Sequence, residues 1–149
     1  MTNAYRFTVN SNIYELAQVR NWFNQFKTIP KSLRQQLDLV LAEGFSNVVY
    51  HAHEHLPEET PIDIELEIFP DRVELRIWDQ GEPFDLFSKK QILDRRHQEI
   101  LDVDDIPTGG RGLMIMESIA DRISYDRTPE GRNCLWIVKN LPTDATSPP

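Results

Sequence analysis

The chain has 149 residues, of which 40% are hydrophobic and 27% are charged, a composition typical of a globular domain. Sixteen basic residues against 24 acidic ones give a formal net charge of -8, which argues against nucleic acid as the main partner because the charges repel phosphate. The single cysteine, Cys134, cannot form an internal disulfide, and the sequence shows neither a signal-peptide pattern nor an apolar run long enough to span a membrane, so a cytoplasmic protein is expected.

The first elements predicted are a strand over residues 5–9 and a helix that follows it. Apolar and polar side chains alternate in the strand segment. Asn12 and Glu15 then have the spacing of a capping box, which marks the start of a helix. The apolar residues at helical intervals behind them are Ile13, Leu16, Val19, Phe23 and Phe26.

A longer helix is predicted over about residues 33–54, opened by a second capping-box pattern at Ser32 and Gln35. Within it Glu43 and Asn47 are four residues apart, so their side chains share one face. Such a pair can be an ordinary solvated face. Alternatively, it can be a carboxylate base beside an amide oxygen that binds Mg²⁺.

Three histidines, His51, His53 and His55, stand at the end of this predicted helix. Alternate residues on a helix do not share a face, and the run lacks the H-E-x-x-H order of zinc proteases. Imidazoles near the C-terminal end of a helix also interact favourably with its dipole. The run therefore does not predict a zinc site.

The next segment, residues 62–77, predicts a hairpin with one apolar and one polar face. Isoleucines and leucines alternate with acidic residues up to a turn at Pro70–Asp71, and the alternation then resumes. An antiparallel sheet that is apolar on one side has to be covered there by helices. We therefore predict an α/β (α+β) two-layer sandwich, with a mixed, mostly antiparallel sheet and helices on one face.

Asp79 ends this hairpin, and Gly81 follows two residues later. Both residue types are common in turns, so a simple strand-ending turn is one interpretation. In the other interpretation, the carboxylate lies at the floor of a pocket and accepts a hydrogen bond from the exocyclic amine of a base. Gly81 would then let the ring approach the backbone closely.

Residues 81–108 are polar and irregular, and a connection of that length is often a functional lid. The stretch TGGRG then precedes a predicted helix over about residues 112–121. It is either a flexible glycine hinge or an anion site, because backbone N–H groups at a helix start attract phosphate and Arg111 adds a fixed positive charge. A second hairpin, turning at Pro129–Gly131, and a disordered tail over residues 142–149 complete the chain.

Three of these stretches, EGFSN, DQGEPF and GGRGL, occur in an order and at a spacing that resemble the N box and the two glycine boxes of the GHKL ATPase/kinase superfamily. The members of that superfamily share the Bergerat ATP-binding fold, an α/β sandwich. The resemblance covers about residues 10–141 and is strongest to the small anti-sigma factor serine/threonine kinases. It predicts a single GHKL-like domain over residues 1–141.

The resemblance implies ATP and Mg²⁺ as cofactors and gives roles to individual residues. Asn47 would coordinate the Mg²⁺, and Glu43 would take the proton from the attacking hydroxyl. Asp79 would recognise adenine, with Gly81 beneath the ring, and residues 85–108 would form the lid. The residues of the second glycine box that would bind the nucleotide are Gly109, Gly110, Arg111, Gly112 and Leu113.

The resemblance also implies a function. The family phosphorylates a serine on an anti-anti-sigma (STAS) protein and sequesters a sigma factor, and the likeness is compatible with a homodimer; no nucleic acid or membrane partner is expected. The alternative is a non-catalytic ATP-binding module that holds a partner in a partner-switching pathway. Gly44 keeps that alternative open, because related sequences more often carry alanine directly after the residue in the position of the base.

Overall fold

The computed structural model describes residues 3–82 and 108–142. The expected lid and the expected tail therefore lie, apart from their terminal residues, outside the described part of the chain. The elements in chain order are β1 (Asn3–Asn10), the 3₁₀ turn η1 (Ile13–Glu15), α1 (Leu16–Phe23), α2 (Lys31–Asn47), the π-helical segment η2 (Val48–Ala52), β2 (Pro61–Ile68), β3 (Arg72–Asp79), α4 (Thr108–Ile119), β4 (Arg122–Arg127) and β5 (Asn133–Asn140).

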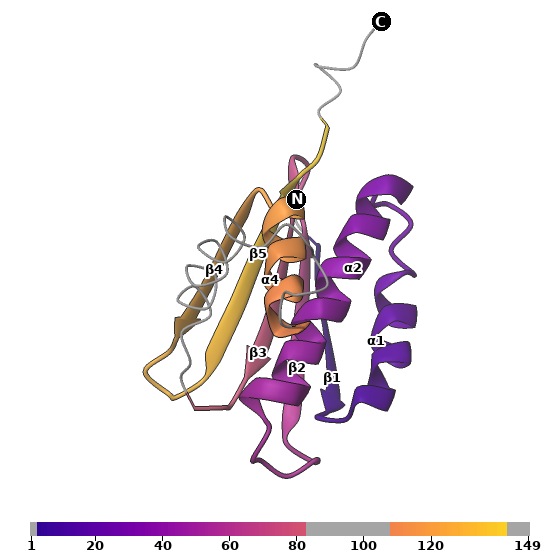
Figure 1. Ribbon diagram of the computed structural model, residues 1–149. Coiled ribbons are helices and arrows are strands. Elements are labelled where there is room, and N and C mark those ends of the chain that lie inside the picture. Colours follow the sequence, from indigo (N-terminus) through magenta and orange to yellow (C-terminus); the bar gives the residue numbers. More distant parts are fainter. Residues whose placement is uncertain (1–2, 83–107, 143–149) are drawn as a thin grey trace, which may run out of the picture.

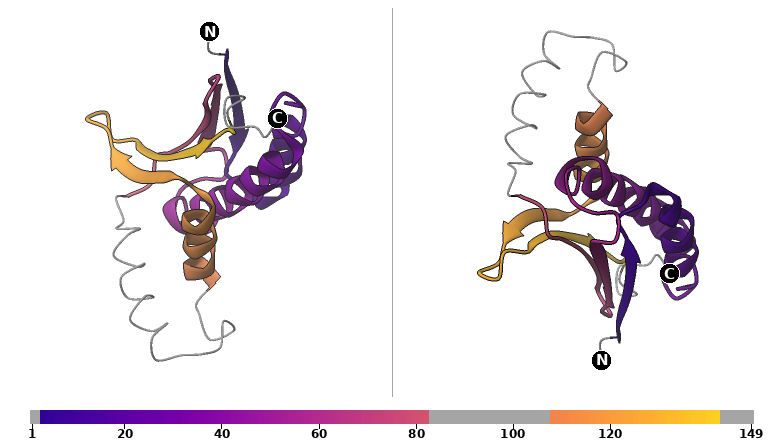
Figure 2. Two further views of the ribbon diagram at one scale, coloured as in Figure 1. Left: turned by 90° about the horizontal axis from the view of Figure 1, so that it is seen from above. Right: turned by 90° about the horizontal axis from the view of Figure 1, so that it is seen from below.

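The strands form one five-stranded sheet in the order β1-β2-β3-β5-β4. The sheet is covered by α1, α2 and α4 on a single face (Figures 1 and 2). This confirms the predicted two-layer sandwich. The expectation of a mixed sheet is wrong for the described strands, because all the neighbouring pairs among them are antiparallel. A parallel pair would need a crossover between adjacent strands, and here the helical connections join strands that run in opposite directions or are not neighbours.

The core lies between the sheet and the helices, as the alternation in the sequence predicts. The inward residues of β2 and β3 are buried, and they form one hydrophobic cluster with the inward residues of β5 and the apolar residues of α2. Burying a Leu, Ile or Phe side chain contributes about 1.5–3 kcal/mol, so this layer holds α2 and α4 in place. The largest fully buried side chains are Phe23, Ile29, Leu37, Leu41, Phe45, Ile62, Ile64, Leu66, Leu75, Ile77, Leu113 and Met116.

The helix starts differ from the two predicted capping boxes. Asn12 does cap its helix, because its Oδ1 accepts a hydrogen bond from the Tyr14 N–H at 2.9 Å, although the first turn is 3₁₀. The prediction for Ser32 is wrong, since α2 begins one residue before it with Pro30 as the N-cap. Pro30 has φ -54° and ψ 142°, and its carbonyl accepts the first helical bond from Arg34 N at 2.8 Å. The fixed φ of proline suits a helix start, and no side chain caps α2.

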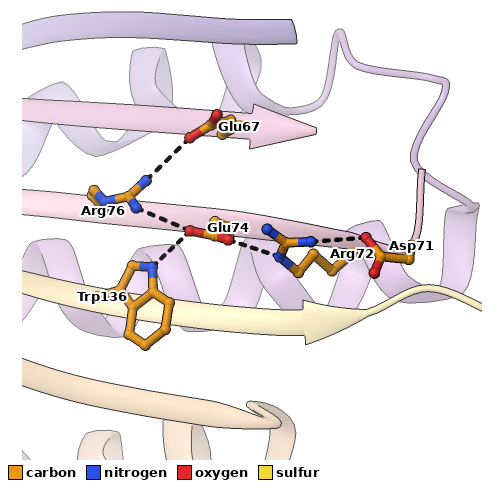
Figure 3. Close-up of polar contacts among 6 residues, drawn as sticks. All are labelled: Glu67, Asp71, Arg72, Glu74, Arg76 and Trp136. Atoms are coloured by element: carbon orange, nitrogen blue, oxygen red, sulfur yellow. Dashed lines mark hydrogen bonds and ion pairs between the residues drawn. The ribbon is translucent and has the colours of Figure 1, made fainter. Parts of the chain in front are cut away.

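The outer face of the sheet carries an ionic cluster centred on Glu74, which is only 6% exposed (Figure 3). Arg72 Nε and Arg76 Nη2 donate to its carboxylate at 2.8 and 2.9 Å, and Trp136 Nε1 donates at 2.9 Å. Burial alone would raise the pKa of Glu74. The hydrogen bonds from Trp136 and Arg72, together with the positive charges of the two arginines, outweigh burial and lower that pKa below its ordinary value.

We expect Glu74→Gln to reduce the free energy of unfolding by about 1–3 kcal/mol, because the arginines lose the charge that they surround. The contribution of Glu74 should be fully present above its ordinary pKa of about 4.3 and should disappear as the pH falls through the lower native value. Urea unfolding at neutral and at acidic pH measures both effects.

The matched control is Glu67→Gln. Glu67 contacts Arg76 at 3.5 Å and its side chain is 29% exposed, so its replacement should change stability by less than about 0.5 kcal/mol. Equal unfolding free energies for Glu74→Gln and the wild type at neutral pH would contradict the prediction.

Candidate functional site

Asp79 is the centre of a buried hydrogen-bond network at the end of β3. Its side chain faces the helices and is 1% exposed. Its Oδ1 accepts hydrogen bonds from Gly81 N at 2.9 Å and from Asn133 Nδ2 at 2.7 Å. Its Oδ2 accepts one from the Tyr125 hydroxyl at 2.8 Å. The carboxylate is therefore fixed in orientation, and a carboxylate oxygen that accepts one bond can accept a second.

Tyr125 and Asn133 come from β4 and β5 and were not predicted as site residues. Burial, and then the charge of Asp79, raise the pKa of Tyr125, so its hydroxyl stays protonated and serves as a donor. Asn133 is 1% exposed and pairs directly opposite Asp79 in the sheet. A polar residue in the inward register of an apolar strand was the available sequence signal for Asn133. Tyr125 offered no comparable signal.

Gly81 is required by a close approach of backbone to backbone. A Cβ atom at this position would lie 2.1 Å from the carbonyl oxygen of Ala52, where no side chain fits. The Gly81 carbonyl also accepts hydrogen bonds from Asn133 Nδ2 and Arg127 Nη1, both at 3.1 Å. The turn after Asp79 is thereby pressed against the end of η2, the continuation of the helix that carries Asn47.

A pocket joins the predicted residues Asp79 and Asn47. The space that it offers to the centre of a water molecule is small, about 10 Å³, and the surrounding empty space of about 270 Å³ includes open solvent. The lining residues are Gly44, Asn47, Val48, Ala52, Asp79, Tyr125 and Leu135. Asn47 and Asp79, which are 32 positions apart in the sequence, thus line one pocket.

Asn47 brings an unsatisfied polar group to this pocket. Its Nδ2 is buried and has no hydrogen-bond partner among the described residues. A buried amide without a partner costs about 1–3 kcal/mol, so the group is available for a ligand. Rotation of the amide by half a turn exchanges its oxygen and nitrogen. Asn47 can therefore present an oxygen to a hard cation such as Mg²⁺.

Glu43 lies one helical turn before Asn47 and meets the glycine-rich start of α4. A Cβ atom on Gly112 would lie 2.7 Å from Glu43 Oε2, so the contact depends on the missing side chain. The predicted helix over residues 112–121 actually begins at Thr108. Gly109 and Gly110 therefore belong to its first turn rather than to a loop before it, and Gly112 follows at the start of the second turn. The N–H groups of a first turn have no acceptor within the helix.

Two further residues of the motifs serve the core. Leu113 is 1% exposed and packs in the hydrophobic cluster. At Gly44 a Cβ atom would lie 2.6 Å from Ile77 Cδ1 and 3.2 Å from Leu135 Cδ2. Glycine at this position lets α2 lie close to the sheet beside the pocket, which gives Gly44 a packing reason that is independent of catalysis.

The three histidines of the run differ in their exposure to solvent. His51 and His55 are exposed, whereas His53 is 3% exposed and hydrogen-bonded. Within the described residues, no group of three or more His, Cys, Asp or Glu side chains could hold a metal ion together. The helices of the described segments also include none with the length and apolar character needed to cross a bilayer.

The sandwich, the buried aspartate at the end of a central strand and the helix bearing Glu43 and Asn47 are together the features of a GHKL-type domain. The comparison with protein families agrees, since the family described as "Histidine kinase-like ATPase domain" matches residues 9–139. The chain belongs to this family.

Curated relatives share part of the chain, and each of the following is named serine-protein kinase RsbW. The protein of Bacillus licheniformis is 30% identical over 89 residues, which are 60% of this chain and 55% of the relative. That of Staphylococcus epidermidis is 34% identical over 86 residues, 58% and 54% of the two chains. That of Listeria innocua is 31% identical over 94 residues, 62% and 59%. The chain thus spans little more than half the length of these relatives.

Proposed function

We propose that this protein is an ATP- and Mg²⁺-dependent serine/threonine protein kinase of the anti-sigma factor type. It would act in the cytoplasm, phosphorylate a serine on an anti-anti-sigma (STAS) partner and bind a sigma factor. The observation that carries the proposal is the shared pocket, which is lined both by the buried Asp79 and by Asn47 with its unsatisfied amide nitrogen. Glu43 lies one helical turn away, against Gly112.

The proposed binding roles follow from what each group can donate or accept. Asp79 Oδ2 would accept a hydrogen bond from the exocyclic amine of adenine, and Gly81 would leave room beneath the ring. The amide oxygen of Asn47 would hold Mg²⁺, which when bound neutralises charge on the phosphates. The backbone N–H groups of the first turn of α4, those of Gly109 and Gly110 among them, would face the phosphates, with the charge of Arg111 beside them and Gly112 leaving room next to Glu43. Leu113 would anchor that turn in the core.

The proposed reaction needs little more than positioning and one base. The serine Oγ of the partner attacks the γ-phosphorus, and its proton passes to the Glu43 carboxylate. The new bond joins Oγ to phosphorus, the bond between phosphorus and the β–γ bridging oxygen breaks, and ADP leaves with that oxygen. Glu43 is suited to this role because its half-buried side chain on α2 lies against Gly112, near the start of α4.

The proposal is tested by incubating the protein with Mg²⁺, γ-labelled ATP and each STAS protein of its source. We expect label on one serine of one STAS protein, and no label when the metal is chelated. Tight nucleotide binding without any phosphoserine would instead support the non-catalytic module. Gly44, which kept that alternative open, also has a packing role against Ile77 and Leu135.

A further inference from the structure

His53 joins three segments of the chain beneath the proposed nucleotide site. It follows η2 directly, its side chain is buried, and its backbone N–H donates to Val48 O at 2.7 Å. Its Nε2 accepts a hydrogen bond from the backbone N–H of Gln80 at 2.8 Å. Its Nδ1 lies 3.1 Å from Ser11 Oγ, just beyond the end of β1. The imidazole thus ties the turn after β3 to the helix end and to β1.

The hydrogen bond to Gln80 determines the state of the ring. A backbone N–H can only donate, so Nε2 must carry a lone pair and the ring proton must be on Nδ1, where it can be donated to Ser11 Oγ. An imidazolium has donors at both nitrogens. Protonation of His53 would therefore set two N–H groups, that of Nε2 and that of Gln80, against each other.

Gln80 is the residue between Asp79 and Gly81, so a hydrogen bond to its backbone amide restrains the conformation of the turn that contains both. We infer that His53 is a positioning residue, which holds the 79–81 turn through the Gln80 amide in the conformation that receives adenine. The inference rests on the proposed function. His53 itself would not touch the nucleotide; it would act through the turn.

The surroundings of the ring keep it neutral near physiological pH. Burial lowers the pKa of His53, and the charge of Asp79 opposes this only in part. The neighbouring ionisable groups on its own segment, Glu54 and His55, are exposed, and Glu58 lies at the segment that pairs with Ser11. Since the native pKa lies below the ordinary value of about 6.5, the turn should weaken only as the pH falls below that value.

The test compares His53→Gln and His53→Leu with the wild type, with Mg–ADP as the probe in calorimetry between about pH 8 and pH 5.5, a window that brackets the ordinary pKa of histidine. Gln offers an oxygen to the Gln80 amide but does not titrate, whereas Leu offers no acceptor. We expect His53→Leu to weaken binding about tenfold or more at every pH. In His53→Gln, binding should persist and fall less at low pH than in the wild type. His55→Gln, at an exposed side chain, should follow the wild type.

The Gln80 amide in the ligand-free protein provides a second readout by NMR. Its chemical shift should follow the titration of His53 in the wild type and stay constant in His53→Gln. Two results would overturn the inference: wild-type Mg–ADP affinity in folded His53→Leu, or a wild-type pH profile in His53→Gln. The second result decides if the leucine variant does not fold.

The proposed function fails separately if the wild type binds no Mg–ADP at any pH. In that case the positioning of the turn is still tested by NMR, and it would be overturned if the Gln80 chemical shift did not change with the titration of His53.

Discussion

Replacing Glu43 by glutamine should lower the rate of phosphoryl transfer to the partner serine by about 100-fold or more. Glutamine has nearly the same shape, so the contact with Gly112 and the packing of α2 on α4 should persist. What is lost is the carboxylate that receives the proton of the attacking hydroxyl. Because the side chain is proposed to act on the hydroxyl and not on the nucleotide, the affinity for Mg–ATP should change by less than about threefold.

Two measurements separate the proposed role of Glu43 from a structural one. Single-turnover transfer of label from γ-labelled ATP to the STAS partner gives the rate, and calorimetry gives the nucleotide affinity of the same preparation. Glu59→Gln, an identical chemical change at an exposed loop position, is the matched control and should retain the wild-type rate. Equal rates for Glu43→Gln and the wild type would exclude Glu43 as the base.

The architecture could be predicted from the sequence where apolar and polar residues alternate strictly. The alternation over residues 62–77 matches the pleat of a strand, so the hairpin, its buried face and the need for covering helices all followed from it. The start of α4 could not be predicted from the sequence. Glycine costs about 1 kcal/mol relative to alanine in a helix, so the glycines at 109, 110 and 112 favoured a loop. The structure continues the helix through them, where Gly112 packs against Glu43 on α2.

The candidate site could be predicted only in part, because some of its contacts join residues that are far apart in the sequence. The motifs around Glu43, Asn47 and Asp79 are short and local, and their order was enough to suggest one pocket. The groups that hold Asp79 in place, Tyr125 and Asn133, are 46 and 54 residues away. Their contact depends on the placement of β5 between β3 and β4, which no local pattern encodes.

This network leads to a sharp expectation for Asp79→Asn: the fold should persist while the affinity for Mg–ATP falls about 10- to 100-fold. Gly81 N and Asn133 Nδ2 are both donors, so they fix the oxygen of the new amide in the place of Oδ1. Its NH₂ group then takes the place of Oδ2, where the Tyr125 hydroxyl can rotate to accept from it. The amine of adenine, also a donor, would meet this NH₂ group instead of a carboxylate oxygen.

The same geometry predicts a change in base preference, which loss of stability alone would not produce. Inosine triphosphate carries a carbonyl where ATP carries the amine, so Asp79→Asn should reduce its binding less and lower the preference for ATP over inosine triphosphate. Calorimetry with both nucleotides, and urea unfolding of the same protein, measure the two effects separately. Asp126→Asn, on the exposed end of β4, should leave both nucleotide affinities unchanged. If Asp79→Asn kept the wild-type preference between the two bases, Asp79 could not be the residue that reads the amine, and the pocket would have to bind its ligand through other groups.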